Sequence, residues 1–133
     1  MKRAVPKIRQ KEARHLGDDG NPAGQAGKEL RRLGTESGRS VAIFAKGLSD
    51  ENRLRILICV CGRKKSVSAV VEEVGLSQPL VSHHLKELKR CLLVTVERNG
   101  PFIYYEAADP RIVDVVQSMA LIATELVASR KTL

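Results

Sequence analysis

Aromatic residues and cysteines are scarce in this sequence, and tryptophan is absent. Its 133 residues include two phenylalanines, two tyrosines and three cysteines. An odd number of cysteines without an export signal argues against a disulfide framework and favours reduced thiols or metal ligands. No apolar run approaches the roughly 20 residues that are needed to cross a bilayer. We therefore expect a cytoplasmic protein that makes no use of a membrane.

Acidic residues are in the minority. The chain has 23 lysines and arginines against 15 aspartates and glutamates, which gives a formal net charge of +8. Such a balance favours a polyanionic partner, although it also serves solubility alone. The sequence shows neither a glycine-rich phosphate loop nor a nucleophile grouped with a base and an orienting residue. We therefore expect that the protein is not an enzyme.

The first part of the chain is predicted to be a tail. Residues 1–27 are rich in basic and turn-forming residues and have little apolar surface to bury. We expect a flexible basic tail there, followed by one folded domain over residues 28–133. Within residues 28–48 a helical tendency is interrupted at Gly34 and Gly38.

Two helices are predicted before the centre of the domain. Ser49 or Asp50 caps the first, which Gly62 ends, and because it is apolar on most of its circumference it should lie in the core. Ser66 caps a second, short helix over residues 67–74. The valines of this segment would also suit a strand, but the cap favours a helix.

Residues 75–90 are predicted to form a turn and a recognition helix. Gly75 ends the preceding helix in a left-handed conformation, Ser77 caps the next one, and Pro79 in its first turn costs no hydrogen bond. The face that should be buried carries Val81, His84, Leu85 and Leu88. The opposite face carries Gln78, Ser82, His83 and Lys86. Such side chains suit a helix in a DNA major groove, while an ordinary solvated face is the alternative.

A hairpin follows the recognition helix. Residues 93–98 and 102–106 are β-branched or aromatic runs, and Asn99-Gly100 between them is a strong turn signal. Pro101 lacks a backbone donor, which fits the start of an edge strand. No strand is predicted before this hairpin, and residues 63–65, between the first two predicted helices, are expected to form a basic loop.

A long amphipathic helix is predicted to close the chain after Asp109. Its apolar residues recur at helical spacing, and they are Ile112, Val115, Val116, Met119, Ile122, Ala123, Leu126 and Val127. This is more apolar surface than a small domain usually covers by itself, so a dimer interface is the favoured use. The alternative is a helix that packs entirely on its own domain.

The order of these elements predicts a mainly α (α+β) fold, a winged helix-turn-helix with a long C-terminal dimerisation helix. The sequence also resembles the ArsR/SmtB repressors. The motifs that carry the resemblance are residues 48–57, Gly75-Leu76-Ser77-Gln78, Val81-Ser82-His83-His84-Leu85 and Tyr104-Tyr105. The resemblance implies a homodimeric cytoplasmic repressor that binds palindromic operators in double-stranded DNA. Many members of the family release DNA when a metal or metalloid binds or when cysteines are modified.

The resemblance also implies which residues contact DNA. We expect these contacts to be Ser77, Gln78, Pro79, Ser82, His83, Lys86, Arg98 and Asn99. Pro101 stands where many members carry a basic residue, which weakens the case for deep minor-groove reading by the wing. Leu92 stands where the family usually has glycine, so the exit from the recognition helix should be strained or differently shaped. His84, on the buried stripe, should be a packed side chain rather than a ligand.

The inducer is less well defined by the sequence. Ser66-Val67-Ser68 replaces the Cys-Val-Cys of arsenic-sensing members, and hydroxyls are poor ligands for soft ions. The remaining candidates for a metal or thiol switch are Cys59, Cys61 and Cys91. On one helix Cys59 and Cys61 would point about 200° apart. The thiols therefore either fill the core, sense by modification, or bind a soft metal, so the cofactor is a soft metal ion or none. A ligand-independent DNA-binding regulator and a module that docks another protein through the last helix remain alternatives.

Overall fold

The computed structural model describes residues 21–32 and 34–130. The chain divides into two compact units, Met1–Arg39 and Ser40–Leu133. In the first unit α1 (Pro22–Arg32) begins after Asn21, whose side-chain oxygen accepts a hydrogen bond from the backbone N–H of Ala23 at 3.1 Å. The expected end of the tail at residue 27 therefore falls inside a helix. Residues 1–20 of the predicted tail lie outside the described residues.

The second helix, α2, spans Gly34–Gly47 and therefore includes both glycines at which an interruption of the helix was predicted. The break at Gly34 is confirmed, because its φ is 73°, a left-handed conformation that glycine adopts without strain. The break at Gly38 is wrong, since α2 continues through it. A single glycine lowers helix stability by about 1 kcal/mol and does not by itself end a helix.

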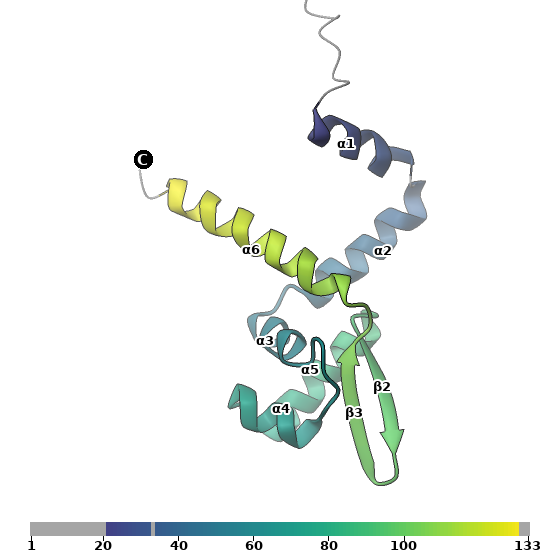
Figure 1. Ribbon diagram of the computed structural model, residues 1–133, viewed down its shortest axis with the longest axis vertical. Helices are drawn as coiled ribbons and strands as arrows, with labels where there is room; N and C mark the ends of the chain where they lie inside the picture. Colours follow the sequence, from purple (N-terminus) through teal and green to yellow (C-terminus); the bar gives the residue numbers. More distant parts are fainter. Residues whose placement is uncertain (1–20, 33, 131–133) are drawn as a thin grey trace, which may run out of the picture. The chain divides into compact units, whose positions relative to one another are not determined.

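Three helices form the helix-turn-helix part of the second unit (Figure 1): α3 (Glu51–Cys59), α4 (Val67–Val74) and α5 (Gln78–Arg90). The side chain of Asp50 caps α3 by accepting the backbone N–H of Arg53 at 2.9 Å. Ser66 caps α4 in the same way through the N–H of Ala69 at 3.2 Å. The bounds predicted for α4 are confirmed. The bounds predicted for α3 are wrong at one end, because the helix stops two residues before Cys61.

The wing is the hairpin of β2 (Val94–Asn99) and β3 (Phe102–Ala107), and both strands were predicted. A third strand, β1 (Lys65–Ser66), pairs antiparallel with β3, so the sheet order is β1-β3-β2. Lys65 was expected in a loop and lies in this strand instead. The expectation that Pro101 begins an edge strand is also wrong, because β3 is the central strand. Two-residue strands leave no periodic signal in a sequence.

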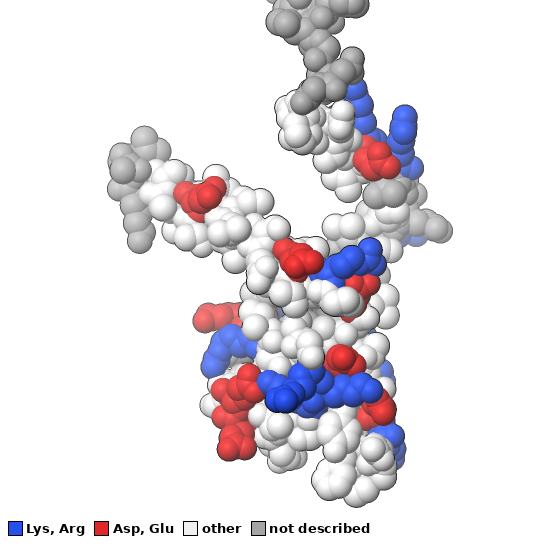
Figure 2. Space-filling model, in the orientation of Figure 1, with Lys and Arg blue, Asp and Glu red and all other residues white. Residues whose placement is uncertain are grey.

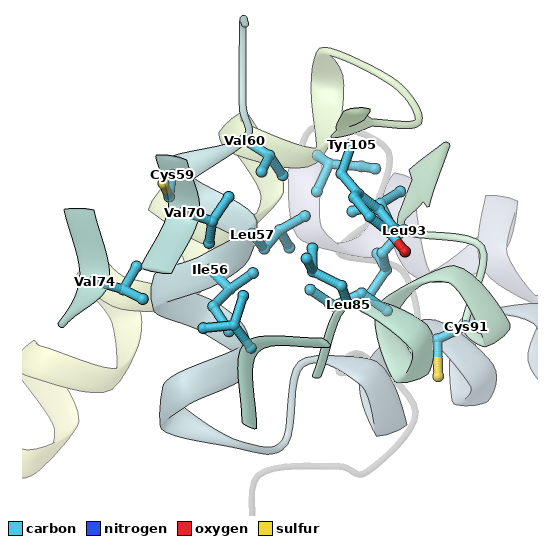
Figure 3. Close-up of a cluster of buried hydrophobic side chains, with 14 residues drawn as sticks. Ile56, Leu57, Cys59, Val60, Val70, Val74, Leu85, Cys91, Leu93 and Tyr105 are labelled. Atoms are coloured by element: carbon cyan, nitrogen blue, oxygen red, sulfur yellow. The ribbon is translucent and has the colours of Figure 1, made fainter. Parts of the chain in front are cut away.

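The core lies where α3, α4, α5 and the base of the wing meet (Figure 3). The whole predicted stripe of α5 is buried, including His84, which confirms the helical spacing. The buried hydrophobic residues are Ile56, Leu57, Cys59, Val60, Val70, Val74, Val81, Leu85, Leu88, Cys91, Leu93, Val94, Tyr105 and Ile112.

The last helix, α6 (Arg111–Arg130), is largely exposed. Asp109 caps it by accepting the backbone N–H of Arg111 at 2.8 Å, and Ile112 is its one buried residue among those that the structure describes. By length and composition the helix is long and apolar enough to cross a membrane, with a mean hydropathy of 1.5 over its most apolar window. The expectation that no apolar stretch reaches the length of a membrane span is therefore wrong. Polar residues interrupt the apolar ones in this helix, but they do not lower its mean hydropathy enough to exclude a span.

Candidate nucleic-acid interface

The polar face of α5 is open to solvent. Gln78, His83 and Lys86 are exposed, and Ser82 between them is half-buried. The opposite face of the same helix is buried in the core, and this burial fixes which way the polar face points. The side chains that sequence reasoning selected on α5 therefore lie on one accessible surface.

The start of α5 is also accessible. Ser77 is the N-cap residue, with φ −64° and ψ 150°, and it is exposed together with Pro79. Gly75, whose φ is 69°, ends α4 by donating its N–H to the carbonyl oxygen of Val71 at 3.0 Å. The N-terminus of a helix offers unpaired N–H groups and a positive dipole end to anions. A phosphate group could therefore be bound where α5 begins.

Two contacts that the sequence did not reveal join α3 and its capping residue to α4 and α5. Arg55 of α3 donates from Nη2 to the carbonyl oxygen of Val74, at 2.6 Å. His84 Nε2 lies 4.0 Å from Asp50 Oδ1, and the buried Nδ1 of His84 has no hydrogen-bond partner. Burial of His84 agrees with a packed side chain. Arg55 is missed by sequence patterns because an arginine on a helix gives no sign of a partner in another element.

The wing is joined closely to α5. The N–H of Leu93 donates to the carbonyl oxygen of Leu88 at 3.0 Å, and Leu93 is buried. Leu92 has φ 62° and is the one non-glycine residue with positive φ among the described residues, so the expected strain after α5 is confirmed. At the tip, Arg98 and Asn99 are exposed beside Gly100. The tip residues and the polar face of α5 belong to the same unit.

Positive charge gathers between the wing and the helices, where Figure 2 shows Lys and Arg side chains beside carboxylates. Lys64 pairs with Glu97 of β2, and Lys65 pairs with Glu73 of α4. The hydrogen bond to Glu97 raises the pKa of Lys64, and the one to Glu73 raises the pKa of Lys65. These two lysines are thus engaged in ion pairs, while Lys86 is exposed on the polar face of α5.

The three cysteines lie in different surroundings. Cys59 and Cys91 are buried on opposite sides of the core in Figure 3, and Cys61 is half-buried. Burial raises the pKa of the Cys59 thiol and of the Cys61 thiol, which lowers their thiolate fraction. Within residues 21–32 and 34–130 no three or more His, Cys, Asp or Glu side chains are grouped as metal ligands would be. The structure therefore does not bring the three thiols together.

Known proteins share this arrangement. Residues 50–96 match the family model described as bacterial regulatory protein, arsR family. A probable mercury resistance operon repressor of Streptomyces lividans is 33% identical over 90 residues, which cover 68% of this chain and 72% of that protein. The arsenical resistance operon repressor of Staphylococcus aureus is 31% identical over 86 residues, which cover 65% of this chain and 83% of that protein.

Solved structures agree with the sequence relatives. The crystal structure of NolR from Sinorhizobium fredii has a TM-score of 0.58 at 29% identity and covers 65% of this chain and 87% of that one. A homodimeric winged helix-turn-helix DNA-binding domain from Mycobacterium bovis has a TM-score of 0.59 at 28% identity, with coverages of 65% and 81%. The fold and the exposed face of α5 thus define a winged helix-turn-helix DNA-binding protein. The chain belongs to the ArsR family, and it is a DNA-binding transcriptional repressor of the ArsR/SmtB type.

Proposed function

We propose that this chain acts in the cytoplasm as a homodimeric repressor on a palindromic operator, with α5 in the major groove. The observation that carries the proposal is the accessible polar face of α5 opposite its fully buried stripe. Gln78, Ser82 and His83 carry donors and acceptors that can meet base edges, and Lys86 can meet a phosphate. Arg98 and Asn99 of the wing contact the backbone or groove beside this site.

The apolar surface of α6 supports the dimer. Val115, Met119, Ile122 and Leu126 recur at helical spacing, and each is more than half exposed. A second copy of the chain that covers this stripe removes it from water, and the M. bovis neighbour is itself homodimeric. Two-fold symmetry then places two copies of α5 about one turn of DNA apart on the same side of the duplex.

The test of base reading is fluorescence anisotropy at fixed salt. Wild-type protein is titrated against DNA from just upstream of its own gene and against a scrambled duplex of equal length. We expect Gln78→Ala with His83→Ala to weaken binding to the first duplex and to leave the second unchanged. Equal weakening on both duplexes would show that these residues do not read sequence.

A charge-matched pair of variants tests the phosphate contact. Lys86→Ala should weaken both duplexes and reduce the slope of log K against log salt by about two, because each of the two subunits of the dimer releases one fewer counterion. Arg130→Ala, at the far end of α6, removes the same charge and should leave the slope unchanged. A protein-interaction module that binds DNA weakly would instead show a shallow salt dependence and no sequence preference in the wild type.

Release of DNA by a soft metal or by thiol modification is the second part of the proposal. One relative is a probable mercury resistance operon repressor and another is a cadmium resistance transcriptional regulatory protein, which supports a soft ion. Because α3 ends at Cys59, helical geometry no longer directs Cys59 and Cys61 to opposite sides. Replacing Cys59, Cys61 and Cys91 by serine should preserve DNA binding and abolish the response to Hg²⁺, Cd²⁺ or a peroxide. Wild-type binding that no addition changes would indicate a ligand-independent regulator.

A further inference from the structure

An exposed aromatic ring lies at the tip of the wing, outside the DNA contacts described above. Phe102, the first residue of β3, is 58% exposed in a chain that has two phenylalanines and two tyrosines in all. It pairs with Asn99 across the turn, and Pro101 beside it is also exposed. A partner surface that covers these two side chains gains from removing them from water.

The strand register directs this ring away from the core. Tyr105 of β3 is buried, and alternation along the strand places Phe102 and Tyr104 on the other face. The rings of Phe102 and Tyr104 lie 6.4 Å apart between centroids, with their planes at 49°. The ring of Phe102 therefore has Tyr104 as a neighbour on the same face of the strand, and more than half of Phe102 remains exposed to solvent.

The charge around the tip is compatible with DNA. Glu97, which pairs with Tyr104 across the hairpin on the same face, is neutralised by its ion pair with Lys64. Arg98 adds an exposed positive charge next to Asn99, and because it pairs with Ile103 its side chain lies on the opposite face of the hairpin from Phe102. In Figure 2 the end of the wing is mostly uncharged, with both basic and acidic side chains beside it. An uncharged tip whose nearest carboxylate, Glu97, is paired with a lysine can approach a groove that is lined by phosphates.

From this geometry we propose that Phe102 and Pro101 form an apolar wedge that enters the minor groove beside the sequence contacted by α5. Pro101 provides no basic side chain to read base edges there, so the wedge acts on the shape of the groove instead. The wedge partly unstacks one base step, and it therefore favours flexible pyrimidine–purine steps such as TA or CA. DNA is the occupant because the wing is fixed to α5 through Leu93, so a duplex that binds α5 lies close to the tip. The inference rests on the proposed function of α5.

Four proteins and two duplexes test the wedge. The longer duplex is the stretch protected by wild-type protein upstream of its own gene, and the shorter one is trimmed at both ends to the α5 half-sites. The variants are Phe102→Ala, Phe102→Thr and Phe102→Leu. Threonine keeps the strand preference of the hairpin without an apolar wedge, and leucine keeps an apolar side chain. Affinity is measured by anisotropy at several salt concentrations, and bending by energy transfer between the duplex ends.

We expect Phe102→Ala and Phe102→Thr to bind the longer duplex about tenfold more weakly, and to bend it less, with an unchanged salt slope. Phe102→Leu should stay close to wild type, and all four proteins should bind the trimmed duplex equally. A threonine variant that behaves as wild type, or an equal loss on both duplexes, would overturn the wedge. Loss of sequence preference in the wild type itself would instead overturn the role of α5, so the two failures are distinguishable.

Discussion

Arg55 in α3 and Val74 at the end of α4 are joined by a hydrogen bond of 2.6 Å from the guanidinium to the carbonyl oxygen. The last carbonyls of a helix have no partner within the helix, so this bond satisfies an acceptor that would otherwise need water. It also ties α3 to the residue that directly precedes the turn into α5. A side chain of α3, 19 residues earlier in the chain than Val74, thus helps to hold the segment that leads into the recognition helix.

Removal of this bond should cost stability. We expect Arg55→Met, which keeps much of the aliphatic packing, to lower the free energy of unfolding by about 1–2 kcal/mol, because a charged donor is lost. Urea unfolding followed by circular dichroism measures the change. Arg130→Ala, on an exposed turn of α6, is the control and should stay within about 0.5 kcal/mol of wild type. If both variants unfold alike, the bond contributes nothing.

Replacement of glycine by alanine should have opposite effects on stability at two positions of α2, Gly47 and Gly38. A Cβ at Gly47 would lie 2.5 Å from Leu93 Cδ1 and 2.8 Å from Cys91 Cβ, whereas a Cβ at Gly38 would meet nothing within 4 Å. Gly47→Ala should therefore destabilise the protein by about 1–3 kcal/mol through overpacking. Gly38→Ala should stabilise it by up to about 1 kcal/mol by favouring the helix. Thermal unfolding of both variants checks the sign, and a stable Gly47→Ala protein would contradict the close approach.

Leu92 is strained by its positive φ of 62°. Because its side chain is 62% exposed, Leu92→Gly gives up little packing and should stabilise the protein by about 0.5–1 kcal/mol. Leu92→Val should be less stable than wild type, since a β-branched residue tolerates this conformation poorly. Chemical unfolding of the pair is the measurement. The opposite order of stability would indicate that the Leu92 side chain makes contacts that outweigh the strain.

Asp109 makes part of the stability dependent on pH. Its side-chain hydrogen bond with Arg111 lowers the pKa of the carboxyl from 3.8 to about 2. Because the folded state binds this proton less readily than the unfolded state, the contribution is present above about pH 4 and disappears as the pH falls toward 2. Asp109→Asn retains a capping side chain but loses the charge. Its melting temperature should lie below that of wild type at pH 6 and should approach it near pH 2. A difference that persists at pH 2 would exclude the ionised carboxyl as the cause.

The stripe on α6 predicts the oligomeric state. Ile122→Glu places a charge in the middle of the proposed dimer surface and should convert the protein to a monomer with weaker operator binding. Thr124→Glu, about 200° around the same helix, is the matched control and should remain dimeric. Sedimentation velocity measures both variants. Wild-type protein that sediments as a monomer, or that associates with lipid vesicles through α6, would contradict the dimer.

The elements that the sequence by itself determined are those with local signals. The caps at Asp50 and Ser66 fixed where α3 and α4 begin, and Gly75 fixed where α4 ends, because a cap is made within a few residues. The buried stripe of α5 followed from helical periodicity, and Asn99-Gly100 determined the turn of the wing. The exposed polar face of α5 followed from the same periodicity, since it is the side of the helix opposite the stripe.

The tertiary structure decided what depends on residues far apart in the chain. Lys65 becomes part of a strand through its pairing with Tyr105, and this pairing places β3 at the centre of the sheet. Close packing of α2 on the start of the wing requires Gly47, and the separation of Cys59 from Cys91 follows from the way α3 and α5 pack. These contacts join segments that are far apart in the chain. No local sequence pattern in either segment predicts its partner, so the contacts are specified only when the core packs.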